Sequence, residues 1–186
     1  MKFLLLPSIG LLALIAPLDT PQKRAPASEQ EDPWSFSAIA ASPTDDAVQN
    51  DLYDKLIGRL LFKKGKTGNA PFFCPVTRMH GRVIHSLELT YRDGDGAASG
   101  GTVTAMLKRV ERSTGRVDVV LTVTSDGRGS LVDERRSRWM TRTSSDPEAP
   151  RFDHEIDLRG FYYYVQINLK RTKAAVAVGA LGVRLQ

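Results

Sequence analysis

The chain has 186 residues, of which 41% are hydrophobic and 25% are charged. This length and composition fit a single folded domain and argue against a chain that is disordered throughout. The formal net charge of +5 is too small to indicate a concentrated basic face, so no nucleic-acid partner is expected. With Cys74 as its one cysteine, the chain forms no internal disulfide.

Residues 1–18 have the pattern of a secretory signal peptide, in which Lys2 precedes the apolar run Phe3–Ala16. The run is shorter than the roughly 20 apolar residues of a membrane span, although an uncleaved anchor or a buried helix is the alternative. Residues 19–33 are rich in proline and charge and predict a flexible linker. We therefore expect a secreted, periplasmic or cell-surface protein with one domain over residues 34–186.

The first part of that domain predicts short strands and turns. Trp34–Ala41 alternates apolar and polar residues and predicts a strand, and the polar segment Ser42–Asp51 predicts a loop. Gly58–Lys63 is expected to be a strand, although the leucines before it also fit a helix. Ala70–Pro75 is apolar and bounded by prolines, which lack a donor and favour a sheet edge.

The centre of the chain predicts a three-stranded meander over Val83–Tyr91, Val103–Leu107 and Val117–Thr124, each with alternating residues. The glycine-rich link between the first two indicates a hairpin with an exposed tip. The residues expected to share one face of its first strand are Val83, His85, Leu87, Leu89 and Tyr91. The long polar connection Ser125–Arg151 predicts a functional or poorly ordered loop, unless it hides an element.

Phe161–Lys170 has the clearest alternation in the chain and predicts a strand. A last strand is expected within Ala174–Gln186, with a bulge at Gly179-Ala180. The sequence has no long amphipathic helix, and its strands are separated by frequent turns. It therefore predicts an all-β fold, an antiparallel β-sandwich (jelly-roll-like or similar) of about eight strands.

Several segments follow one another in a recognisable order: Phe-Phe-x-Pro-Val, a glycine turn, a strand ending in Tyr-x-Asp, a strand ending in Leu-x-Arg, a Tyr-Tyr-Val strand and a final edge strand. The residues are Phe72, Phe73, Pro75, Val76, Gly81, Val83, Leu87, Tyr91, Asp93, Val103, Leu107, Arg109, Tyr163, Tyr164, Val165, Gly182, Val183 and Leu185. This layout resembles uncharacterised exported bacterial β-sandwich proteins of unknown function. The resemblance implies export and a β-sandwich and assigns no catalytic residue. The chain departs from it at Arg78-Met79-His80-Gly81, where such proteins usually have Leu-Pro before a glycine pair.

One face of the Tyr-rich strand is the candidate binding surface. Its side chains are Tyr162, Tyr164, Gln166 and Asn168. Rigid aromatic rings and amide groups on one face suit the recognition of a sugar or a protein. The alternative is that a second sheet or a loop covers the tyrosines.

Asp93 and Asp95 are a weak calcium candidate, because hard cations need several oxygens from one tight loop. The spacing does not fit an EF-hand, since Ala97 and Thr104 stand where further ligands would be required. Aspartate and glycine are also common turn residues. No cofactor is expected.

A hydrolase would need other side chains. Cys74 with a histidine is one combination, although Cys74 also fits a buried hydrophobe and His85 a core residue. The histidines are His80, His85 and His154. Another combination draws on the acids Asp153, Glu155 and Asp157, whose alternative role is a solvated strand face. No spacing typical of a zinc site occurs. Four arginines in the long connection could meet an acidic polymer or simply be solvated: Arg135, Arg136, Arg138 and Arg142.

Together these features predict an exported, non-enzymatic binding or structural module with an unknown ligand, which could act as a homo-oligomer. The alternative is a secreted hydrolase that acts on a glycan or a peptide.

Overall fold

The computed structural model of the protein describes residues 33–94, 100–125, 140–144 and 154–186. The predicted signal peptide and nearly all of the predicted linker lie outside these residues. The described chain is almost entirely β-structure, with one short α-helix, α1 (Asp45–Gln49), and one 3₁₀ helix, η1 (Ala38–Ala40). Within these residues, no helix has the length and hydropathy of a membrane span.

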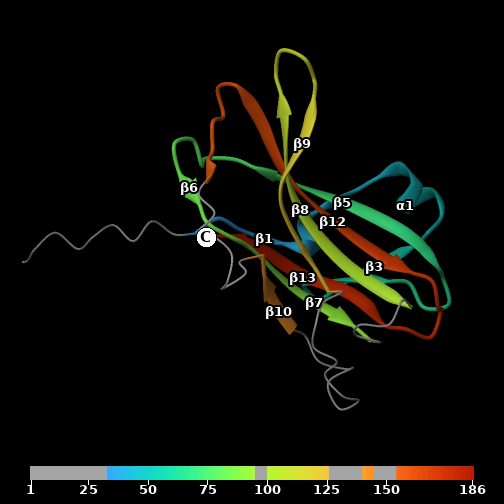
Figure 1. Cartoon of the computed structure of the whole chain (residues 1–186). Coiled ribbons are helices and arrows are strands. Elements are labelled where there is room, and N and C mark those ends of the chain that lie inside the picture. Colours follow the sequence, from blue (N-terminus) through green and yellow to red (C-terminus); the bar gives the residue numbers. More distant parts are fainter. Residues whose placement is uncertain (1–32, 95–99, 126–139, 145–153) are drawn as a thin grey trace, which may run out of the picture. The chain divides into compact units, whose positions relative to one another are not determined.

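Two antiparallel sheets pack against each other (Figure 1). The first sheet has the strand order β10 (Met140–Thr143), β7 (Leu87–Asp93), β13 (Val178–Leu185), β4 (Arg59–Phe62) and β3 (Tyr53–Leu56). A further strand that pairs with β13 is β1 (Ser35–Ser37). The second sheet has the order β2 (Ser42–Pro43), β5 (Gly68–Val76), β12 (Phe161–Arg171), β8 (Gly101–Glu111) and β9 (Val117–Thr124). A separate pair consists of β11 (His154–Glu155) and β6 (Val83–Ile84).

The predicted all-β antiparallel sandwich is confirmed. The described residues contain thirteen strands rather than about eight. The difference comes from strands of two to four residues, among them β2, β6 and β11. An alternation with a period of two cannot be recognised over so few residues.

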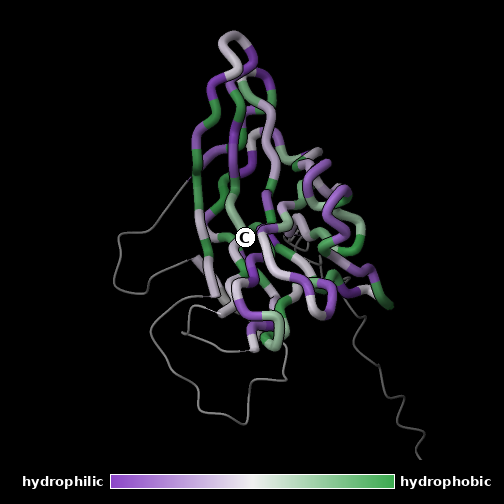
Figure 2. Tube along the Cα trace, turned by 90° about the vertical axis from the view of Figure 1, so that its right-hand side faces the viewer, coloured by the Kyte–Doolittle hydropathy of each residue, from purple (hydrophilic) through white to green (hydrophobic). Residues whose placement is uncertain are grey.

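The core lies between the sheets and is built from alternating residues of the long strands. Four inward residues of β12 are at most 4% exposed: Tyr163, Val165, Ile167 and Leu169. Burial of each large aliphatic side chain contributes about 1.5–3 kcal/mol, so this core is the main source of stability. Figure 2 shows the same alternation as hydrophobic and hydrophilic segments along the strands.

The prediction that β7 and β8, in the centre of the chain, form a hairpin is wrong. β7 lies in the first sheet, between β10 and β13, whereas β8 lies in the second sheet, between β12 and β9. The link between them therefore joins the two sheets instead of two neighbouring strands. Alternation indicates which side of a strand is buried, but it does not identify the partner strand. The β8–β9 half of the predicted meander is confirmed.

The strand predicted over Val83–Tyr91 is interrupted. The backbone N–H groups of His85 and Ser86 both donate to the carbonyl of Gln186, at 2.5 and 3.0 Å. Ile84 is 1% exposed and Val83 is 48% exposed, so the buried side is reversed before this interruption. The expectation that Val83 shares the buried face of β7 is therefore wrong.

The N-terminal part is more structured than predicted. The expected loop Ser42–Asp51 contains β2 and α1, which is capped by Thr44 through a 3.4 Å hydrogen bond from the Ala47 N–H to its hydroxyl. The expected strand over Gly58–Lys63 is confirmed as β4, and β3 forms a hairpin with it. The turn uses positive φ angles at both Ile57 (41°) and Gly58 (74°).

The last strand and the long connection differ in detail from the prediction. The bulge in β13 falls between Ala180 and Gly182, not at Gly179-Ala180. A Cβ at Gly182 would lie 2.8 Å from the carbonyl oxygen of Phe36, so glycine allows β1 to approach β13 closely. The long connection contains β10, while residues 126–139 and 145–153 lie outside the described part of the chain.

Arg171, the last residue of β12, connects several loops from inside. It is 3% exposed, and its guanidinium donates to the carbonyls of Lys63, Lys66 and Val176. The same group lies 4.7 Å from the ring centroid of Phe62. Burial lowers the pKa of Arg171, and its hydrogen bonds replace the water that a buried charge needs.

Candidate functional site

The four side chains predicted as a binding surface share the outward side of β12, in the middle of the second sheet. Tyr162 is 57% exposed, and Tyr164, Gln166 and Asn168 are half-buried. They alternate with the core residues of the same strand, which pairs with β8 along its whole length and with β5 from Tyr163 onward. A strand in this position gives little freedom to the direction of its side chains.

Hydrogen bonds fix the polar half of this row. The Lys108 ammonium donates to Gln166 Oε1 at 2.8 Å, and Gln166 Nε2 donates to Asn168 Oδ1 at 2.7 Å. The chain of bonds sets the orientation of both amides and holds the ammonium against the sheet. An ammonium has three N–H donors, so Lys108 can still donate hydrogen bonds to a ligand.

Aromatic packing fixes the other half. Tyr164 meets Phe73 of β5 edge to face, with ring centroids 5.5 Å apart. Burial raises the pKa of Tyr164, so its hydroxyl stays protonated and can donate. Tyr162 lies under the guanidinium of Arg112, 4.2 Å from the ring centroid. We call the surface formed by Tyr162, Tyr164, Gln166, Asn168, Phe73, Lys108 and Arg112 the β12 platform.

The sequence identified four of these residues and missed three: Phe73, Lys108 and Arg112. Phe73 belongs to the segment predicted as a sheet edge, and it lies opposite Gln166 in the register of β5 and β12. Lys108 lies opposite Tyr164 in the register of β8 and β12. Each of the three is recognisable as a neighbour of β12 only when the strand order is known.

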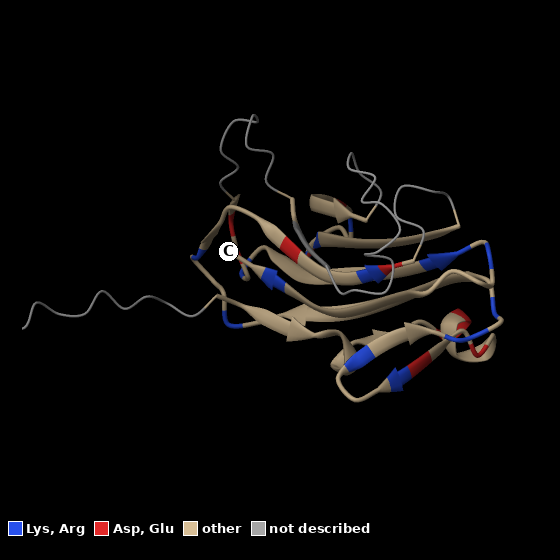
Figure 3. Ribbon diagram, turned by 90° about the horizontal axis from the view of Figure 1, so that it is seen from below, with Lys and Arg blue, Asp and Glu red and all other residues tan. Residues whose placement is uncertain are grey.

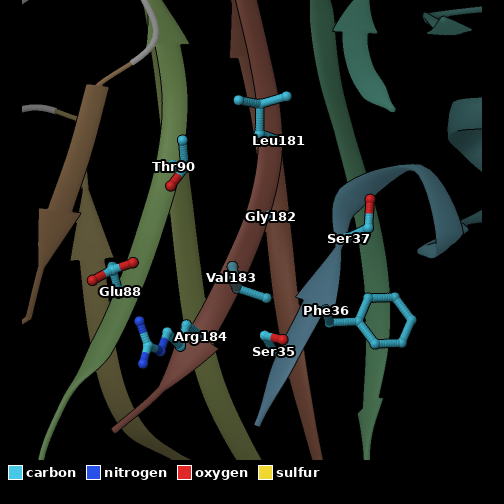
Figure 4. A pocket seen from close by; sticks show the side chains of 9 residues that line it. All are labelled: Ser35, Phe36, Ser37, Glu88, Thr90, Leu181, Gly182, Val183 and Arg184. Carbon is cyan, nitrogen blue, oxygen red and sulfur yellow. The ribbon is translucent and has the colours of Figure 1, made fainter. Parts of the chain in front are cut away.

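A second surface feature lies on the outer side of the first sheet. A shallow depression of about 340 Å³ is bordered by β1, β7 and β13 (Figure 4). Its lining residues include Ser35, Phe36 and Ser37 of β1, Glu88 of β7 and Arg184 of β13. These residues come from three distant segments, so no pattern in the sequence points to the depression.

The cysteine proposed for a hydrolase is unsuited to that role. Cys74 is buried in the core on the inward side of β5, and burial raises the pKa of its thiol to about 12. A nucleophilic cysteine needs a lowered pKa and access to substrate. Cys74 is therefore a buried hydrophobic residue of the core, which is the alternative that the sequence also offered.

His154 and Asp157 have structural partners. His154 Nε2 lies 3.1 Å from the Tyr163 hydroxyl, and burial, followed by the charge of Arg109, lowers the pKa of His154. Asp157 accepts from the backbone N–H groups of Arg159 and Gly160, which holds the pKa of its carboxyl down. This is the geometry of a turn-capping aspartate.

The remaining candidates of the hydrolase hypothesis are scattered. His80 Nδ1 accepts from the backbone N–H of Leu158 at 3.1 Å, and His85 lies at the interruption between β6 and β7. Glu155 is exposed and Asp153 lies outside the described residues. Among the described residues, no three His, Cys, Asp or Glu side chains form a group that could hold a metal ion.

The calcium candidate Asp93 does not lie at an exposed tip. It is 2% exposed, and its Oδ2 accepts from the Ser125 hydroxyl at 2.6 Å. That hydroxyl oxygen accepts in turn from the backbone N–H of Val103 at 2.9 Å, so Asp93 ties β7 to the second sheet. Asp95 lies outside the described residues, as do Arg135, Arg136 and Arg138; Arg142 lies in β10.

The arrangement defines the class of protein as an antiparallel β-sandwich with a fixed polar-aromatic surface on its second sheet. No protein-family model and no curated protein matches the chain. Solved structures with a similar fold include the potassium-bound carbohydrate recognition domain of Emp46p (12% identity, 76% of this chain, 91% of that chain, TM-score 0.37). Another is the family 11 carbohydrate-binding module from Clostridium thermocellum in complex with a mixed-linked tetrasaccharide (10% identity, 85% of this chain, 92% of that chain, TM-score 0.37).

Proposed function

We propose that the protein is an exported, non-enzymatic binding module and that its β12 platform binds a glycan chain. The observation that carries this proposal is the row of Tyr162, Tyr164, Gln166 and Asn168 on the outward side of one paired strand. Aromatic rings pack against the apolar faces of sugars, and oriented amides pair with their hydroxyl groups. Export is our expectation from the apolar start of the chain.

Preorganisation supports a binding role. The amides of Gln166 and Asn168 are held by each other and by Lys108, and the ring of Tyr164 is held by Phe73. A ligand that meets side chains already held in place loses less conformational entropy on binding. Of the residues offered for hydrolysis, Cys74 is in the core and Asp157 caps a turn.

A glycan array probed with the full-length protein tests the proposal. We expect binding to one or more glycans, and loss of that binding in Tyr164→Ala and Gln166→Ala. Leu56→Ala is the control, because Leu56 is an exposed residue (54%) on β3 of the other sheet, away from the platform. Binding that survives both platform variants but is lost in a variant of the depression, such as Arg184→Ala, would move the site to the first sheet. Absence of binding to any glycan would contradict the proposal.

A further inference from the structure

The charged side chains on the outward side of the second sheet are all positive. Among the outward-pointing side chains of its described strands, the charged ones are Lys108 of β8 and Lys170 of β12. No Asp or Glu of these strands points to that side; Asp118 of β9 shares the opposite side with Arg109. Figure 3 shows the charged residues of the strands as separate blue and red segments, and the acidic residues of α1.

Arg112 adds a third cation at the Tyr162 end of the platform. Its backbone N–H donates to the carbonyl of Gly160 at 3.0 Å, which fixes the turn that presents its side chain. The guanidinium lies over the ring of Tyr162. A planar guanidinium can bind a carboxylate or a sulfate through two parallel hydrogen bonds.

The acids closest in sequence to Arg112 have other partners. Glu111 accepts from the hydroxyls of Ser113 and Thr114, at 3.3 and 2.7 Å. Asp118 accepts from two other arginines, Arg109 at 3.2 Å and Arg116 at 3.3 Å. The described part of the chain therefore records no carboxylate paired with Arg112, and its fork is available for an external anion.

The three cations are spread along the outward side of the second sheet, from Arg112 at one end of the platform to Lys170, which lies beyond Asn168. Tyr162 and Lys170 are eight steps apart on β12, which is about 27 Å at a rise of ~3.4 Å per residue. Lys108 lies between them, opposite Tyr164. A surface of this length fits a chain of several sugars better than a single sugar.

We propose that the ligand of the β12 platform is an acidic polysaccharide, whose carboxylate or sulfate groups pair with Arg112 and Lys108 while its rings pack on Tyr162 and Tyr164. The inference rests on the proposed function and names the substrate class of the same site. A nucleic acid is the less suitable polyanion, because its affinity depends on many phosphate contacts and the platform has few cations.

The test compares polysaccharides that share a backbone and differ in charge. Full-length protein is titrated calorimetrically with polygalacturonate and with its methyl ester, and with a sulfated galactan and its desulfated form. We expect at least one acidic polymer to bind about tenfold or more tightly than its neutral counterpart, as for a charge-assisted hydrogen bond. Affinity should fall as the salt concentration rises.

Arg112→Gln and Lys108→Gln are each expected to remove that preference, and Arg112→Lys to retain part of it. The matched control is Arg184→Gln, which makes the same change of charge on the outer side of the first sheet. Thermal melting verifies that each variant is folded. If Lys108→Gln fails to fold, the preference for acidic polymers is tested with Arg112→Gln alone.

The outcomes separate the two proposals. Equal binding of acidic and neutral polymers, lost in Tyr164→Ala, would overturn the acidic ligand and leave the glycan platform standing. Tighter binding of single-stranded DNA than of every acidic polysaccharide would overturn the choice of glycan. Failure to bind any polysaccharide would overturn both.

Discussion

Two arginines near opposite ends of β12 lie over aromatic rings, and they differ in burial and in hydrogen bonding. Arg171 lies 4.7 Å from the ring centroid of Phe62, and Arg112 lies 4.2 Å from that of Tyr162. Arg171 is 3% exposed and gives its donors to backbone carbonyls. Arg112 is exposed, and no described carboxylate pairs with it.

The difference shows that burial, more than the local ring contact, decides the role of such a cation. Inside the protein, each donor must find an acceptor, so Arg171 becomes a structural connection between loops. At the surface, the ring holds the guanidinium in place and leaves its donors to a ligand. The same contrast separates the inward and outward sides of β12 as a whole.

The largest expected difference in stability is between variants of these two arginines. Arg171→Met removes a buried guanidinium and leaves the carbonyls of Lys63, Lys66 and Val176 without this donor, and we expect it to lower the free energy of unfolding by about 2–4 kcal/mol. Arg112→Met should change it by less than about 0.5 kcal/mol. Urea denaturation followed by tryptophan fluorescence measures both, and similar losses in the two variants would contradict the contrast.

Adjacent tyrosines on β12 provide a second, smaller comparison. The Tyr163 hydroxyl lies 3.1 Å from His154 Nε2 and accepts from the Asp157 N–H at 3.4 Å. Tyr163→Phe is therefore expected to cost about 1 kcal/mol of unfolding free energy. Tyr162→Phe should be nearly neutral for stability, because that side chain is 57% exposed. Denaturation midpoints distinguish the two, and a larger loss in Tyr162→Phe would count against the assignment.

The smallest effect is a pH dependence. The pKa of His154 is below its ordinary value of 6.5 in the folded protein, because burial and the charge of Arg109 disfavour its protonated form. The unfolded chain therefore binds the proton more readily, and the unfolding free energy should fall as the pH drops below about 6.5. His154→Gln should reduce the loss measured between pH 7.5 and pH 5. An unchanged loss would show that other groups cause it.

The outward row of β12 could be predicted from the sequence because eleven residues alternate without interruption. The partners of β7 could not, because alternation has no information on strand order, and its neighbours β10 and β13 lie far along the chain. Phe73, Lys108 and Arg112 were missed for the same reason. The interruption at His85 depends on a carbonyl at the end of the chain, that of Gln186, which no local pattern reveals.

The most direct test of the account is to locate the bound glycan by NMR. An acidic oligosaccharide is titrated into the isotope-labelled full-length protein, and backbone and side-chain amide signals are followed. The account predicts shifts at the side-chain amides of Gln166 and Asn168 and along β8 and β12, with little change around Arg184. Shifts confined to the depression formed by β1, β7 and β13, or no shifts at all, would contradict it.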